Sequence, residues 1–130
     1  MRKNMDAYIN YVCPYCWNTL NNCSCDLFPP YCLIFIDKNI QEHIRLLNKK
    51  GYRTTACCEG HKDAGMNTYI AFTDNYFDDT SVPNGFKYDR KRKMVTHTYS
   101  TKLDENKLEE VKKEMLLVLL EWCKSLPNNI

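Results

Sequence analysis

The chain has 130 residues, which is enough for one compact domain and excludes a second full-sized one. Hydrophobic residues are 44% and charged residues 26% of the total, so the chain can build a core and is not disordered as a whole. The formal net charge of +2 favours no class of partner, and apolar runs such as 115–120 are far shorter than the about 20 residues of a membrane-spanning helix. Arg2 and Lys3 are not followed by the apolar stretch of a secretory signal, which predicts a cytoplasmic protein without a membrane partner.

Cysteine is the most unusual feature of the composition, with 8 in the chain and half of them before residue 31. Residues 1–30 also contain the pair Pro29 and Pro30 and show no sustained apolar period, so this stretch cannot order itself by burying side chains. We therefore predict a zinc knuckle at 1–30 and an α+β domain at 31–130, packed together as one unit.

The cysteines of the first 30 residues come in two close pairs, a spacing typical of metal ligands. In a reducing cytoplasm such clusters bind metal more often than they form disulfides. Four thiolates at about 2.3 Å around zinc form a closed tetrahedral site that holds structure and does not activate water. An iron–sulfur cluster, disulfides and unligated thiols are the alternatives. We predict one zinc ion bound by Cys13, Cys16, Cys23 and Cys25.

Regular elements are expected from residue 31 onward. The wholly apolar run 31–36 is typical of a central strand that is covered on both faces. Asp37 is expected to cap a helix at 38–50, which has apolar residues at helical spacing on one face. Gly51 fits the left-handed position that follows such a helix.

The middle of the chain predicts strands. Residues 52–57 and 68–73 are rich in aromatic and β-branched residues and flank a glycine-containing loop at 59–66. Two further extended pieces, 85–89 and 93–99, are expected to pair as a hairpin.

The last predicted element is a long amphipathic helix. Asp104 is expected to cap its first turn, and Pro127 ends it. The predicted apolar face consists of Leu108, Val111, Met115, Val118, Leu119 and Trp122. The order of elements predicts an α+β fold: a small, mostly antiparallel sheet with two helices on one face and an N-terminal zinc knuckle.

A second cluster of reactive residues stands where the strand 52–57 ends: Cys57, Cys58, Glu59 and His61. Adjacent residues of a strand face opposite sides, so one cysteine is expected in the core and the other beside His61. Three interpretations stay open: ordinary packing, a metal site that Cys58 and His61 join, and a catalytic site with Glu59 as base or a cysteine as nucleophile. The metal in the second case is a second zinc or one shared with the N-terminal segment.

Two resemblances involve these motifs. The stretch 54–61, Thr-Thr-Ala-Cys-Cys-Glu-Gly-His, resembles the Thr-Thr-Ser-Ser-Cys-Ser-Gly-Arg signature of the wybutosine-synthesis tRNA methyltransferase family, and departs from it at Ala56, Cys57, Glu59 and His61. The paired cysteines followed by Gly-Tyr-x-Thr at 51–54 and Cys-Cys-x-Gly-His at 57–61 are similar to small uncharacterised zinc-knuckle proteins of low-GC Gram-positive bacteria and their phages. The first resemblance is too local to imply methyl transfer, and the second carries no established activity to transfer.

The hairpin predicted at 85–99 has a strongly basic turn: Lys87, Arg90, Lys91, Arg92 and Lys93, with Asp89 among them. Such a turn can contact nucleic-acid phosphates, and the neighbouring Phe86, Tyr88 and Tyr99 are expected to stack on unpaired bases. The alternative is a charged turn that is only solvated.

These features predict a zinc-stabilised binding module that acts on a macromolecular partner, either a protein or RNA/DNA. A phage-encoded inhibitor of a host protein is one form of this prediction. The alternative is a small RNA-modifying enzyme built around Cys58, Glu59 and His61. The sequence leaves the oligomeric state and the identity of the partner open.

Overall fold

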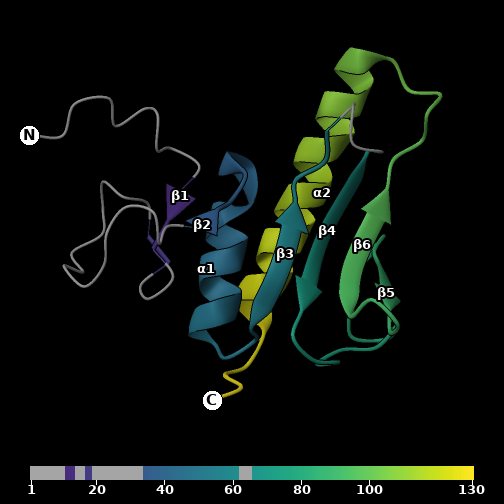
Figure 1. Ribbon diagram of the computed structural model, residues 1–130. Helices are drawn as coiled ribbons and strands as arrows, with labels where there is room; N and C mark the ends of the chain where they lie inside the picture. Colours follow the sequence, from purple (N-terminus) through teal and green to yellow (C-terminus); the bar gives the residue numbers. More distant parts are fainter. Residues whose placement is uncertain (1–10, 14–16, 19–33, 62–65) are drawn as a thin grey trace, which may run out of the picture.

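The computed structural model describes residues 11–13, 17–18, 34–61 and 66–130 (Figure 1). Cys16, Cys23 and Cys25, three of the predicted zinc ligands, lie outside these residues. Cys13 is buried, and its carbonyl accepts the Trp17 N–H at 2.8 Å. The four-cysteine zinc site therefore stays a prediction.

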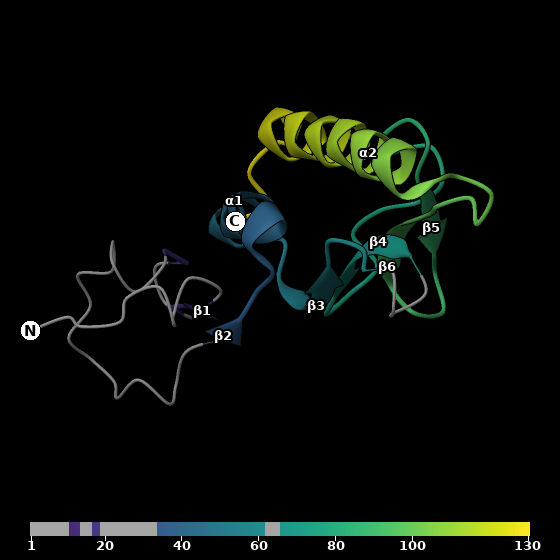
Figure 2. The same cartoon turned by 90° about the horizontal axis from the view of Figure 1, so that it is seen from above.

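The main sheet is antiparallel and has the strand order β3-β4-β6-β5. Its strands are β3 (Thr54–Cys58), β4 (Asn67–Phe72), β5 (Lys87–Asp89) and β6 (Met94–Thr98). The two longest helices, α1 (Gln41–Lys49) and α2 (Glu105–Ser125), cover one face of this sheet (Figures 1 and 2). The predicted α+β class is confirmed, and so is the hairpin of β5 and β6.

The core lies between this sheet and the helices. Thr68, Ile70 and Phe72 alternate along β4 on the helix-covered face, with exposed fractions of 3% or less. Ile70 pairs in register with Val95 of β6, which is also fully buried. Because successive residues of a strand point to opposite faces, the residues between these three face the other side of the sheet.

Helix α2 begins as predicted, because the Asp104 carboxylate accepts the Lys107 N–H at 2.8 Å. The predicted apolar face is only partly correct: Val118 is 37% exposed, whereas Leu116 and Lys112 are buried. Residues at positions i, i+3 and i+4 share a helix face, and the buried set is rotated relative to the predicted one. No helix among the described residues is long and apolar enough to cross a membrane.

The helix predicted at 38–50 is confirmed as a 3₁₀ turn, η4 (Lys38–Ile40), which continues into α1. Gly51 has a φ of +94° as expected, and a Cβ there would lie 3.0 Å from the backbone of Asn129. Lys50 binds the end of α2: its Nζ donates to the carbonyls of Cys123, Lys124 and Leu126 at 2.7–2.8 Å. These contacts hold the C-terminal ends of the two helices together.

The prediction of a central strand at 31–36 is wrong for the part that the structure describes. Ile34 and Phe35 form the short strand β2, which pairs with β1 (Tyr11–Val12) in a separate two-stranded sheet. Phe35 is 57% exposed, so this strand is not covered on both faces. A short apolar run does not by itself distinguish a core strand from an edge ribbon.

The helix layer contains a buried histidine, His43, whose Nε2 lies 2.7 Å from the Leu116 carbonyl of α2 and donates to it. Its Nδ1 is buried and has no hydrogen-bond partner within the part of the chain that the structure describes. Burial lowers the pKa of His43 below its ordinary value of 6.5, although the Leu116 carbonyl acts in the opposite direction. The folded protein therefore holds this imidazole in the neutral form.

We expect the free energy of unfolding to fall as the pH is lowered below 6.5, toward the lower pKa that His43 has in the folded protein. Below 6.5 the unfolded chain binds a proton at His43 that the folded chain resists, so this contribution is complete above 6.5 and lost below it. Urea unfolding at several pH values measures the effect. His43→Gln should flatten the slope, and an equal slope in His43→Gln would contradict the prediction.

Candidate metal centre

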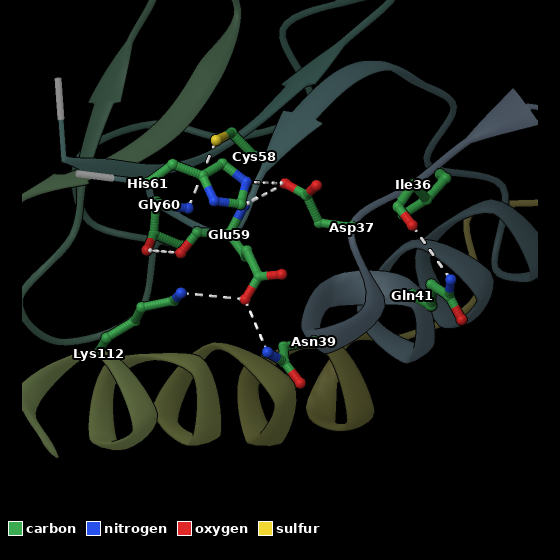
Figure 3. A network of polar contacts seen from close by, with 10 residues as sticks. Ile36, Asp37, Asn39, Gln41, Cys58, Glu59, Gly60, His61 and Lys112 are labelled. Atoms are coloured by element: carbon green, nitrogen blue, oxygen red, sulfur yellow. Dashed lines mark hydrogen bonds and ion pairs between the residues drawn. The ribbon is translucent and has the colours of Figure 1, made fainter. Parts of the chain in front are cut away.

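Three potential metal ligands converge where strand β3 ends. Cys58 is the last residue of β3, and Gly60, with a φ of +103°, turns the chain so that His61 lies beside it. Asp37 comes from the segment just before η4. Figure 3 shows the Cys58, His61 and Asp37 side chains on the same side of the loop.

The donor atoms of Asp37, Cys58 and His61 all lie within 4.8 Å of one another. The His61 Nε2–H donates to Asp37 Oδ2 at 2.9 Å, and the same oxygen accepts the Glu59 N–H at 3.2 Å. The Gly60 N–H donates to Cys58 Sγ at 3.4 Å. Asp37 makes no capping hydrogen bond to η4, so its predicted role as a helix cap is replaced by these contacts.

One oxygen, one sulfur and one nitrogen donor form a set that suits zinc. Donors around a tetrahedral zinc ion lie about 3.3–3.8 Å apart, a spacing that these three side chains could reach by small movements. The Asp37 side chain is 14% exposed and His61 is 47% exposed, which leaves the cluster open to solvent. The backbone N–H groups of Gly60 and Glu59 donate to the Cys58 sulfur and the Asp37 carboxylate. Outer hydrogen bonds of this kind orient metal ligands.

Without a metal, Cys58 is a protonated thiol at neutral pH. Burial raises its pKa, negative charge at Asp37 and Glu59 adds to the rise, and the Gly60 N–H offsets part of it. The pKa of the neighbouring Cys57 is raised to about 12, again chiefly by burial. Neither thiol is activated as a nucleophile, because reactive cysteines have lowered pKa values.

Glu59 points away from this cluster and toward α2 (Figure 3). It is 6% exposed, and its Oε2 lies 3.1 Å from Lys112 Nζ and accepts the Asn39 side-chain N–H at 2.8 Å. Lys112 is itself 9% exposed, so the two charges are buried together. A carboxylate held this way is a structural partner of α2, and it is not placed to act as a base beside Cys58 and His61.

The backbone of the same loop is fixed by a buried hydroxyl pair. Thr68 of β4 donates from Oγ1 to the Glu59 carbonyl at 2.8 Å, so Tyr99 must be the donor in its 2.6 Å contact with Thr68. Thr68 and Tyr99 are 0% and 3% exposed. The segment that carries Cys58 and His61 is thus attached to both the sheet and α2.

The structure brings together two of the four residues predicted at this cluster, Cys58 and His61. Cys57 pairs in register with Ile70 and packs against the core, which confirms that the adjacent cysteines face opposite sides. Asp37 was missed as a possible ligand because the residue before a helix is usually a cap. Asp37 is also more than 20 residues from Cys58 in the sequence, so no local pattern indicates that the two side chains meet.

The second predicted site, the basic turn, is accessible in part. Lys87, Arg90, Lys91 and Arg92 are exposed, and Lys93 is half-buried. The predicted stacking residues Phe86, Tyr88 and Tyr99 are 7% exposed or less, so the stacking prediction is wrong. Their rings belong to the core, because the strands they occupy or flank direct them toward the helices.

Comparison with known proteins adds no relative to these observations. No family model, no curated protein and no solved structure matches the chain. The assignment of Asp37, Cys58 and His61 therefore rests on their geometry.

Proposed function

We propose that this protein is a zinc-binding module whose described metal centre consists of Asp37, Cys58 and His61. The single observation that carries the proposal is the convergence of their three donor atoms within 4.8 Å. The surrounding contacts support it, since the loop is fixed by buried hydrogen bonds on both sides. The predicted zinc at Cys13, Cys16, Cys23 and Cys25 would be a separate, structural ion.

The alternative of an RNA-modifying enzyme has less support. It needs a base or a nucleophile at Cys58, Glu59 and His61. Glu59 is engaged by Lys112, and burial raises the pKa of the Cys58 thiol. The geometry favours metal binding over acid–base or thiolate catalysis by these three side chains.

Zinc content tests the proposal with a matched pair of variants. Cys58→Ala should lower the zinc bound per chain by one ion, because it removes the sulfur donor. Cys57→Ala should leave the zinc content unchanged, because its side chain faces the core. Elemental analysis after gel filtration measures both, and equal zinc in Cys58→Ala and the unmodified protein would contradict the proposal.

We further propose that the macromolecular partner of the module is a nucleic acid contacted at the basic turn. The exposed Lys87, Arg90, Lys91 and Arg92 offer charge to phosphates, and Asp89 accepts the backbone N–H groups of Lys91 and Arg92 at 3.0 Å, which shapes the turn. Contact with phosphates predicts binding without sequence preference that weakens steeply with salt.

Fluorescence anisotropy with a labelled single-stranded oligonucleotide tests this proposal. Replacing Arg90, Lys91 and Arg92 together by alanine should weaken binding. It should also reduce the slope of the logarithm of the binding constant against the logarithm of the salt concentration by about three or less. Lys49 and Lys113, exposed lysines on the helices, serve as a control pair. Equal loss in the control variant, or no binding at low salt, would favour a protein partner instead.

A further inference from the structure

The metal centre opens toward the face of the sheet that the helices do not cover. Cys58 of β3 pairs in register with Tyr69 of β4, and their neighbours Cys57 and Ile70 face the core. Cys58 and Tyr69 therefore share the opposite face, where the Cβ atoms of such a pair lie about 4.5–5.5 Å apart. Figure 2 shows both helices on the other side of the main sheet.

The phenol of Tyr69 is half-buried on this face, next to the sulfur-bearing residue of the centre in the strand register. Its hydroxyl can donate a hydrogen bond. No other aromatic side chain pairs across the sheet with Cys58 among the described residues.

The charge of the centre indicates which ligand it would accept. A divalent ion with one thiolate and one carboxylate is neutral overall, so a small anion meets no net repulsion there. Three protein donors leave a tetrahedral ion one free position, as in zinc sites that bind an exchangeable ligand. The half-exposed His61 places that position at the surface.

We propose that a metal ion at Asp37, Cys58 and His61 binds a small anion, such as a carboxylate, at its fourth position, and that Tyr69 donates a hydrogen bond to that anion. This inference rests on the proposed function of the same centre. It adds a ligand class and a specificity residue, Tyr69, which the sequence did not indicate.

Cobalt(II) provides the test, because its visible bands report the coordination of the ion and its near-ultraviolet band reports bound thiolate. A full-length background variant with Cys16, Cys23 and Cys25 replaced by serine, which removes the predicted N-terminal site, is loaded with one equivalent of cobalt and titrated with sodium azide as the probe anion. We expect the visible bands to shift in a saturable way as azide enters the fourth position. Tyr69→Phe, which keeps the ring, should raise the azide dissociation constant about tenfold, the effect of one hydrogen bond to a charged group.

Tyr76→Phe is the matched control, since Tyr76 bonds to Thr73 and lies away from the β3–β4 register pair of Cys58. It should leave azide affinity unchanged. Equal affinities in Tyr69→Phe and the unmodified protein would overturn the role of Tyr69.

The failure of this inference differs from that of the proposed function. If cobalt binds with a thiolate band that Cys58→Ala abolishes, yet azide causes no shift, the fourth position is closed by another donor of the chain and the anion site is refuted. The zinc-binding function then stands. If no thiolate band depends on Cys58, both proposals are wrong.

Discussion

Replacing Lys112 by methionine is expected to lower the free energy of unfolding by about 3–5 kcal/mol, the cost of leaving one charge of a buried pair without its partner. Lys112 Nζ lies 3.1 Å from Glu59 Oε2, and both side chains are buried. In Lys112→Met the Glu59 carboxylate would keep only the Asn39 N–H as a described donor. Urea unfolding followed by circular dichroism measures the loss.

Two further variants show whether the loss comes from the unpaired charge. The double variant Lys112→Met with Glu59→Gln should recover much of the stability, because the remaining amide is neutral and still accepts from Asn39. Lys113→Met, at the exposed neighbouring position, should change stability by no more than about 0.5 kcal/mol. A loss in Lys112→Met that the double variant does not reduce would mean that packing of the lysine stem, and not charge, is responsible.

The pH dependence of Lys112→Met gives an independent check. An unpaired buried carboxylate becomes neutral more readily than a solvated one, since burial disfavours the charged form. The difference in stability between Lys112→Met and the unmodified protein should therefore shrink as the pH is lowered. A difference that does not depend on pH would contradict an electrostatic origin.

The Lys112–Glu59 pair also connects α2 to the candidate metal centre. Glu59 stands between Cys58 and Gly60, so the pair fixes the backbone that carries two of the three proposed ligands. Hydrogen-bonded neighbours of metal ligands affect metal affinity by about 10–100-fold when they are removed. A weaker zinc affinity in Lys112→Met, at a pH where the variant is folded, would follow from the same geometry.

Local signals in the sequence located the elements that have caps and periodic faces. Asp104 and Gly51 mark the ends of helices for reasons that act within a few residues, and both were predicted correctly. The run 31–36 was misassigned because its apolar character does not say which strand will pair with it. Pairing of β2 with β1 joins residues that are more than 20 positions apart.

The candidate site shows the same division between local and long-range information. Cys58 and His61 are close in sequence, and a turn at Gly60 suffices to bring them together. Asp37, just before η4, and Lys112, on α2, reach the same loop from distant parts of the sequence. A polar residue inside an apolar face, as Lys112 is on α2, is the one sequence feature that indicates a buried partner, because an unpaired charge would not be tolerated there.

Zinc binding at Asp37, Cys58 and His61 should stabilise the fold itself. A ligand that binds only the folded state adds about 2.7 kcal/mol at a free concentration of 100 times its dissociation constant. For a chain of this length the gain corresponds to a rise in melting temperature of roughly 10 °C. Thermal unfolding with and without zinc, followed by circular dichroism, measures the shift.

The N-terminal cysteines must be removed from this measurement, because a zinc ion bound to them would also stabilise the protein. A background variant with Cys16, Cys23 and Cys25 replaced by serine isolates the contribution of the centre at β3. In that background the shift should persist in Cys57→Ala and disappear in Cys58→Ala and in His61→Ala. The shift should also shrink as the pH is lowered, because zinc must displace the proton of the Cys58 thiol, whose pKa is raised. A zinc-dependent shift that survives Cys58→Ala in this background would mean that the ion is bound elsewhere in the chain.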